Sequence, residues 1–179
     1  MRAFSAIDVP DKIREKIFKF QKILPRQSLS FVQRKAMHIT LHFFENINES
    51  QAAIVSQAIS NFNTAPFEVE VNGVSYFGKG SAIRVIYAKV NDSAKQISAL
   101  YSQISQVLID SKTPFDHKYE YVPHITIARC KDSPAYLKDI IMQNQDHMFG
   151  KFISRKVLLQ KSTLTPLGSE YTLLHESKV

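Results

Sequence analysis

Two four-residue motifs of the same type lie far apart in the chain, and their residue types could carry out acid–base chemistry. His38-Ile39-Thr40-Leu41 and His124-Ile125-Thr126-Ile127 each read histidine, apolar residue, threonine, apolar residue. Both lie in runs of strand-forming residues. Because side chains alternate between the two faces of a strand, the histidine and threonine of each motif are predicted to share one face. We therefore interpret the motifs as two halves of one site.

Phosphoester transfer or hydrolysis without a metal is the chemistry that suits such a pair. Imidazole has a pKa of about 6.5, so one histidine can accept a proton from attacking water while the other donates one to the leaving oxygen. The hydroxyls of Thr40 and Thr126 can donate hydrogen bonds to phosphate oxygens on which negative charge builds up in the transition state. His38 and His124 are the predicted catalytic residues, and the residue types leave open which is the acid.

An isolated strand histidine is more often structural than catalytic, and the matched context of the two motifs is what favours function. His42 shares the predicted face with His38, but Ala128 stands at the corresponding place in the second motif, so we interpret His42 as a rim residue. The i, i+4 spacing of His38 and His42 also occurs in helical metal sites, but Ile-Thr-Leu between them favours a strand. The remaining histidines have no patterned neighbours and receive no role: His117, His147 and His175.

Arg129 follows the second motif and could bind a phosphate through two parallel hydrogen bonds. Strict alternation places it on the apolar face, opposite His124, so it reaches the site only if the strand ends or bulges there. Several aromatic residues could stack a base, although aromatic residues in strands belong more often to the core: Phe43, Phe44, Tyr76 and Phe77.

The elements that must position the motifs alternate between strands and helices. Apolar residues at spacings of three and four predict helices over 11–24, 48–62, 92–108 and 134–141. Alternating or continuous apolar runs predict strands over 2–7, 67–77, 82–90, 122–130, 151–161 and 170–175, and one strand or a pair of strands over 31–45. The motifs lie 86 positions apart (38 to 124), near half the chain length. We predict an α+β fold of two related lobes, each a mostly antiparallel sheet with helices outside.

Composition narrows the class of protein. A chain of 179 residues with 44% hydrophobic residues suits one domain, residues 1–179. The lone Cys130 forms no internal disulfide, and no apolar stretch approaches the roughly 18 residues of a membrane helix. We expect a cytoplasmic protein, and a monomer because no long apolar stripe is left over.

The net charge of +7 is concentrated near the start of the chain. Residues 1–35 hold nine Lys and Arg against three Asp and Glu, which is six of the seven excess charges. Such a distribution fits a polyanionic partner such as RNA, and fits a solvated basic helix face equally well.

The sequence resembles the two-histidine phosphoesterase superfamily, and most closely its RNA 2′,3′-cyclic phosphodiesterase branch, historically called 2′-5′ RNA ligase. The paired motifs carry the likeness to the superfamily. The opening RAFSAID of residues 2–8 and the closing STLTPLGSEY of residues 162–171 point to the branch. Residues 84–87 read RVIY, where family members often have tryptophan in place of Tyr87, a difference that touches packing and leaves substrate stacking open.

This resemblance implies a bilobed, pseudo-twofold fold in which the motifs lie on adjacent central strands that line a cleft. It implies that His38 donates a proton to the departing 3′ oxygen and that His124 accepts one from water, which leaves a 2′-phosphate. It also implies that Thr40, Thr126 and Arg129 hold the phosphate of an RNA end, and that no metal or nucleotide cofactor is needed.

Two alternatives remain at this stage. The substrate could be another cyclic or 2′-5′-linked phosphodiester, such as an oligoadenylate or cyclic ADP-ribose phosphate, with ligation as a weak reverse reaction. A non-catalytic RNA-binding module is the alternative from a different class, supported by the basic N-terminal helix and by exposed aromatic residues. The doubled His-Thr pair argues against it, because binding alone does not require two such motifs.

Overall fold

A computed structural model describes residues 1–62, 65–79, 82–93, 95–132, 134–166 and 168–178. Its helices are α1 (Asp11–Gln21), α2 (Glu49–Ser60), α3 (Gln96–Asp110) and α4 (Ala135–Gln143), with a short 3-10 helix, η1 (Arg34–Ala36). Its strands are β1 (Ala3–Ile7), β2 (Leu29–Phe31), β3 (Ile39–Phe44), β4 (Phe67–Lys79), β5 (Ala82–Asn91), β6 (His124–Cys130), β7 (Met148–Ser154), β8 (Lys156–Thr165) and β9 (Gly168–Lys178). None of the described helices is long and apolar enough to span a membrane.

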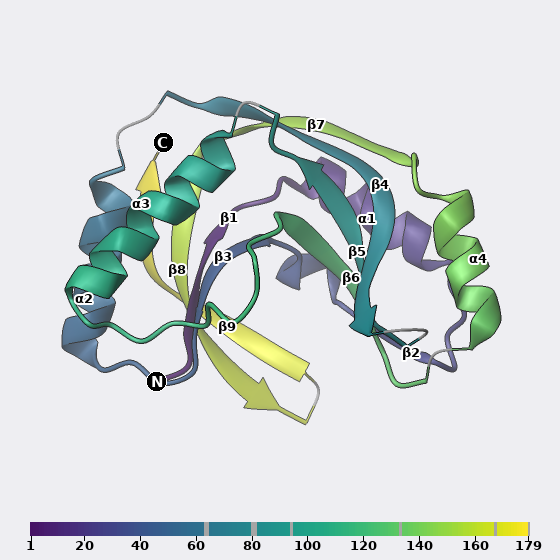
Figure 1. Cartoon of the computed structure of the whole chain (residues 1–179), viewed down its shortest axis with the longest axis horizontal. Helices are drawn as coiled ribbons and strands as arrows, with labels where there is room; N and C mark the ends of the chain where they lie inside the picture. Colours follow the sequence, from purple (N-terminus) through teal and green to yellow (C-terminus); the bar gives the residue numbers. More distant parts are fainter. Residues whose placement is uncertain (63–64, 80–81, 94, 133, 167, 179) are drawn as a thin grey trace.

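The described strands form one nine-stranded antiparallel sheet in the order β7-β4-β5-β6-β3-β1-β8-β9, with β2 paired to β6. The sequence predicts one sheet in each lobe, whereas the structure has a single sheet. The two motif strands connect its two parts, because β3 and β6 pair through Ile39 and Ile125. We call β3, β1, β8 and β9 half A, and β6, β5, β4, β7 and β2 half B. The sheet curls strongly between the halves (Figure 1). The α+β class and the antiparallel pairing are confirmed.

The helices cover the two halves separately. Helices α2 and α3 pack against half A, and α1 and α4 pack against half B (Figure 1). The order β1-α1-β3-α2 recurs as β5-α3-β6-α4. Shifted by the 86 positions that separate the motifs, α1 falls within α3, at 97–107, and α2 begins where α4 begins, at 135. This constant shift supports the predicted pseudo-twofold duplication.

Two predicted strands are wrong. The stretch 31–45, expected to be one strand or a pair of strands, contains the end of β2, the 3-10 helix η1 and then β3, and β2 pairs with β6. The sequence pattern predicts a single strand over 151–161, whereas the structure has β7 paired with β4 in half B and β8 paired with β1 in half A. The chain passes from one half to the other at Arg155. No glycine or proline marks this crossing. The polar run Ser154-Arg155-Lys156 between two apolar segments is the one sign of it in the sequence.

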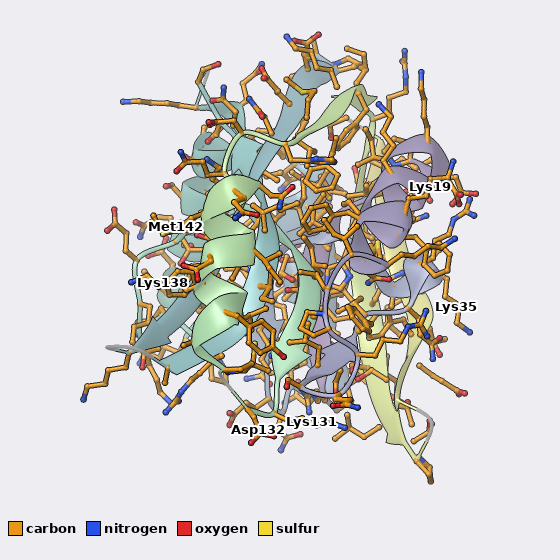
Figure 2. All side chains as sticks on the ribbon, turned by 90° about the vertical axis from the view of Figure 1, so that its right-hand side faces the viewer. Lys19, Lys35, Lys131, Asp132, Lys138 and Met142 are labelled. Carbon is orange, nitrogen blue, oxygen red and sulfur yellow. The ribbon has the colours of Figure 1, made fainter. Side chains whose placement is uncertain are left out.

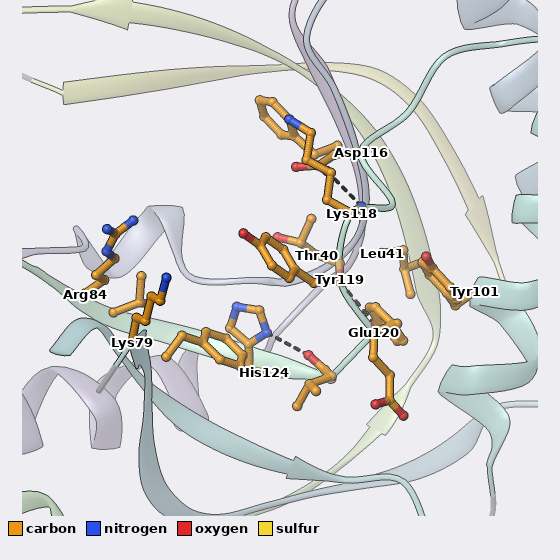
Figure 3. A pocket seen from close by; sticks show the side chains of 16 residues that line it. Thr40, Leu41, Lys79, Arg84, Tyr101, Asp116, Lys118, Tyr119, Glu120 and His124 are labelled. Carbon is orange, nitrogen blue, oxygen red and sulfur yellow. Dashed lines mark hydrogen bonds between the residues drawn. The ribbon is translucent and has the colours of Figure 1, made fainter. Parts of the chain in front are cut away.

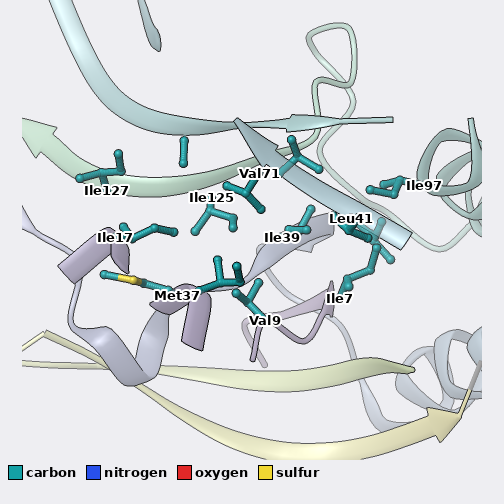
Figure 4. Packing of buried hydrophobic residues seen from close by; sticks show 14 of the residues in the cluster. Ile7, Val9, Ile17, Met37, Ile39, Leu41, Val71, Ile97, Ile125 and Ile127 are labelled. Carbon is teal, nitrogen blue, oxygen red and sulfur yellow. The ribbon is translucent and has the colours of Figure 1, made fainter. Parts of the chain in front are cut away.

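The apolar residues of both motifs are fixed in a core that the two halves share. Ile39, Leu41, Ile125 and Ile127 are at most 4% exposed and lie in one buried cluster with side chains from α1, α3 and β4 (Figure 4). Full burial of one such side chain contributes roughly 1.5–3 kcal/mol. Because these residues face the core, the histidines and threonines that alternate with them are held on the opposite face of the sheet.

Candidate active site

Each motif strand has a β-bulge directly after its threonine. In β3, Thr40 pairs with Ala6 and His42 with Ser5, which leaves Leu41 as the extra residue. In β6 the same irregularity makes Ile127 the extra residue, because Thr126 pairs with Tyr87 and Ala128 with Ile86. A bulge reverses the alternation of side chains beyond it. Residues 43 and 129 therefore return to the face that carries the histidines and threonines.

The bulge in β3 makes the interpretation of His42 as a rim residue wrong. His42 is 1% exposed and lies on the helix side of the sheet. Its Nδ1 lies 3.1 Å from the Ser5 hydroxyl, its Nε2 lies 2.8 Å from the Ser105 hydroxyl, and its ring stacks on Tyr101 of α3 at 4.6 Å. His42 is a buried structural residue that ties β3 to α3.

The bulge in β6 brings Arg129 to the site. Ile127 and Ala128 are both buried, and the exposed Arg129 lines the same cavity as His38 and Thr126. Strict alternation would have placed it in the core. Arg129 was expected to reach the site only if the strand ended or bulged there, and the bulge at Ile127 meets this condition.

The two histidines are held in the same way. Nδ1 of His38 lies 2.8 Å from the carbonyl oxygen of Ala36, and Nδ1 of His124 lies 2.8 Å from that of Val122 (Figure 3). A carbonyl oxygen only accepts hydrogen bonds, so Nδ1 carries the proton in both rings and donates it. In the neutral rings, Nε2 is then the basic nitrogen left for chemistry.

Aromatic rings fix both imidazoles in place. His38 stacks on Phe4 with ring centroids 4.4 Å apart and meets the edge of Tyr171 at 5.6 Å. His124 packs against Phe77 at 4.9 Å and Tyr87 at 5.2 Å. The tyrosine that replaces the family's frequent tryptophan is therefore part of the packing around His124.

Burial favours the neutral form of both imidazoles. It lowers the pKa of His38 to about 4, and positive charge on Arg14 and His124 acts in the same direction, against the hydrogen bond to Ala36. Burial also lowers the pKa of His124, with a further contribution from the Arg129 guanidinium and an opposing one from the hydrogen bond to Val122. A positive charge on His124 therefore disfavours protonation of His38.

Two adjoining cavities meet at the motifs. A cavity of about 270 Å³ is lined by His38, Thr126 and Arg129, and a larger one of about 900 Å³ is lined by His124 (Figure 3). Thr40 and Phe43 line both. All five residues predicted for the site thus line these two adjoining cavities, with His38 in one, His124 in the other and Thr40 in both.

The smaller cavity is also lined by residues that were not predicted for the site. Arg2 and Tyr171 line it together with Ser30, Ser162 and Ser169. The Arg2 guanidinium lies 4.7 Å from the centre of the Phe43 ring. Burial raises the pKa of Tyr171, and the positive charges of Arg129 and Arg2 oppose this rise. The only signal for Arg2 and Tyr171 was their place in the opening and closing segments that carry the family resemblance.

The aromatic candidates for base stacking separate into two groups. Phe43 and Phe77 are half-buried and line the larger cavity. Phe44 is fully buried in the core, and Tyr76 packs against the core. Only the first two can meet a bound nucleotide directly.

Comparison with known proteins agrees with this geometry. Residues 9–149 match the family model described as the 2′-5′ RNA ligase superfamily. An RNA 2′,3′-cyclic phosphodiesterase of Methanocaldococcus jannaschii is 32% identical over 98% of this chain and 99% of its own length, and one of Archaeoglobus fulgidus is 30% identical over 96% of each. The chain therefore belongs to the 2′-5′ RNA ligase superfamily.

Solved structures show the same fold. TT0787 of Thermus thermophilus superimposes with a TM-score of 0.86 at 24% identity, covering 99% of this chain and 97% of that one. LigT of E. coli, complexed with 3′-AMP, gives a TM-score of 0.83 at 20% identity over the same shares of the two chains.

Proposed function

We propose that this protein hydrolyses RNA 2′,3′-cyclic phosphate ends to 2′-phosphomonoesters, without a metal, by acid–base catalysis from His38 and His124. The observation that carries the proposal is the matched pair of imidazoles. Each has Nδ1 bonded to a backbone carbonyl two residues earlier and lines an opening that also contains Thr40, Thr126 and Arg129. The substrate class comes from the relatives, which are named RNA 2′,3′-cyclic phosphodiesterases.

In the proposed reaction, neutral His124 takes a proton from water at Nε2 while the water oxygen forms a bond to phosphorus. The bond between phosphorus and the 3′ oxygen breaks, and protonated His38 donates its proton to that oxygen. The phosphate stays on the 2′ oxygen, and the two histidines end with their protonation states exchanged. Each positioned proton transfer contributes about 10²- to 10⁴-fold to the rate.

The other three residues bind the phosphate in this proposal. Thr40 and Thr126 donate hydrogen bonds to its nonbridging oxygens, where charge increases in the transition state. The planar guanidinium of Arg129 can donate two parallel hydrogen bonds to the same group. Its positive charge also favours the neutral form of His124, which is the form that a general base must have.

His38 must gain its proton when substrate binds, because its pKa of about 4 leaves it neutral in the free protein at neutral pH. The cyclic phosphate carries one negative charge. Placed beside the ring, this charge stabilises the imidazolium and raises the pKa of His38.

We further propose that the enzyme acts in the cytoplasm as a monomeric single domain.

Turnover of RNA that ends in a 2′,3′-cyclic phosphate, with a chelator present, tests the proposal. We expect the unmodified protein to yield a 2′-phosphate, and the variants H38A and H124A to lose at least a hundredfold in kcat while still binding RNA. His175→Ala, which removes a half-buried histidine of β9 that contacts Ser60 and lies outside both cavities, serves as the matched control. An unchanged rate in H38A or H124A contradicts the mechanism, and a 3′-phosphate product contradicts the assigned leaving group.

A further inference from the structure

The larger cavity extends beyond the residues that the reaction uses. From His124 and Thr40 it continues between the end of the β4–β5 hairpin and the segment 116–122. Figure 3 shows Lys79 and Arg84 together on the hairpin side, and Tyr119 across from them with His124 below. A cavity of about 900 Å³ is near the upper end of the range for sites that hold a small molecule, so it has room for more than the reacting nucleotide.

The cations of this cavity are available to an anionic ligand. Among the ion pairs between described residues, none involves Lys79, Arg84 or Lys118. The basic N-terminal region differs, because Arg14 and Arg34 pair there with Asp8 and Glu15.

Two carboxylates also line the larger cavity, and they lie apart from the hairpin cations. In Figure 3 the carboxylate of Glu120 points away from Lys79 and Arg84, and Asp116 lies beside Lys118 at the other end of the opening. The hairpin side of the cavity is therefore the side suited to a phosphodiester.

Tyr119 offers a surface on which a base can stack. Its side chain is 87% exposed, so it adds little to the core, yet it lines the opening above His124 (Figure 3). Exposed aromatic rings beside positive charge are the arrangement by which proteins bind single-stranded nucleic acid.

We propose that the larger cavity binds the nucleotide that precedes the cyclic-phosphate nucleotide in the RNA strand. Its base stacks on Tyr119, and the phosphodiester that joins it to the terminal nucleotide lies against Lys79 and Arg84. The ligand is single-stranded RNA of two or more nucleotides, and the enzyme consequently prefers an oligoribonucleotide to a mononucleotide. The inference rests on the proposed function, because it extends the substrate of the same site.

The preference is measured as the ratio of kcat/KM for the dinucleotide ApA with a 2′,3′-cyclic phosphate to kcat/KM for adenosine 2′,3′-cyclic phosphate. We expect a ratio of about ten or more in the unmodified protein, and a loss of about tenfold in this ratio in Y119A, since base stacking is lost. Tyr119→Phe keeps the ring and is expected to keep the ratio.

The double variant K79Q/R84Q tests the phosphodiester contact. We expect its ratio to fall and to depend less on salt concentration, because fewer counterions are released on binding. The matched control is K12Q/K138Q, which removes two cations from the exposed faces of α1 and α4, outside both cavities, and is expected to keep the ratio.

The outcomes separate this inference from the function on which it rests. Turnover of both substrates with equal kcat/KM in the unmodified protein overturns the second-nucleotide site and leaves the proposed function standing. An unchanged ratio in both Y119A and K79Q/R84Q overturns it as well. Turnover of neither substrate overturns the proposed function, and the second-nucleotide site with it.

Discussion

The two histidines proposed as catalytic have the same kind of backbone partner, a carbonyl oxygen two residues earlier, and different neighbours beyond the bulge. Shifted by 86 positions, Phe43 of β3 corresponds to Arg129 of β6, and each is the residue that the bulge returns to the cavity face. One half of the site therefore presents an aromatic ring where the other presents a cation. This difference breaks the symmetry of the two His-Thr pairs, and the cation acts on His124. It supports the assignment of the base to His124.

Removing the charge of Arg129 is predicted to raise the pKa of His124. The guanidinium disfavours the imidazolium, so R129Q stabilises the protonated ring. A base works when deprotonated, and the acidic limb of the kcat/KM profile therefore moves to higher pH. Loss of hydrogen bonds to a charged group, worth about 1.5–3 kcal/mol, lowers kcat/KM by roughly 10- to 150-fold.

NMR titration of the His124 ring in the free protein and the pH profile of kcat/KM measure the two effects of R129Q. Arg129→Lys is the control, because it keeps the charge and loses the planar fork; we expect a smaller change in the pKa of His124 but a similar loss of kcat/KM. If R129Q leaves the pKa of His124 where it was, the electrostatic role of Arg129 is wrong.

The bulges of β3 and β6 mark the limit of what the alternation of side chains along a strand could predict. The paired motifs, all four helices and most strands follow from apolar periodicity, because burial imposes that periodicity. A bulge inserts one residue without any change of residue type, so Leu41 and Ile127 look like ordinary members of the pattern. This one backbone feature explains both the burial of His42 and the arrival of Arg129 at the site.

Polar side chains of neighbouring elements hold each bulge. The Gln21 amide of α1 donates to the carbonyl oxygens of Val32, at 2.9 Å, and of the bulge residue Ile127, at 3.0 Å. In β3, the Ser5 hydroxyl accepts the backbone N–H of His42, whose ring reaches Ser105 of α3. Helix α1 thereby fixes β6, and α3 fixes β3.

Gln21 is therefore predicted to be a positioning residue for Arg129. Gln21→Met keeps the approximate size of the side chain and removes both hydrogen bonds. We expect a loss of about 1–3 kcal/mol in the free energy of unfolding. We also expect roughly a tenfold loss of kcat/KM, because the bulge no longer holds Arg129 in one place.

A double-mutant cycle separates this role from general destabilisation. If Gln21 acts through Arg129, Q21M lowers kcat/KM much less in the R129Q background than in the unmodified protein. Phe20→Leu, a buried substitution on the same helix at a ring that packs on Phe149 of β7, is the control, and its effect on activity is expected to be small. Additive losses in the cycle contradict the positioning role.

Both cavities lie on a molecule with one hydrophobic core. Among the described strands, the backbone pairing that joins the halves is the single pair Ile39–Ile125 between β3 and β6, but the buried cluster runs through both halves. The chain also crosses between the halves at Arg155, from β7 to β8. The relative position of His38 and His124 is therefore set by the folding of the entire chain.

Folding of this chain also buries neutral histidines, so acid is predicted to destabilise it. Burial lowers the pKa of His42 to about 3 and that of His38 to about 4, and it lowers the pKa of His124. The unfolded chain has histidine pKa values of about 6.5 and binds these protons first as the pH falls. Stability is full above about pH 6.5 and declines through the window between 6.5 and the folded-state values.

The slope of this decline tests the burial of His42. Each buried histidine contributes up to about 1.4 kcal/mol per pH unit to the fall in the free energy of unfolding. Urea denaturation between pH 7 and pH 5 should give a smaller slope for His42→Gln, because one proton fewer is taken up on unfolding. Tyr101→Leu removes the ring that stacks on His42 and should lower stability by a similar amount at both pH values. Equal slopes for His42→Gln and the unmodified protein would mean that His42 is not buried in its neutral form.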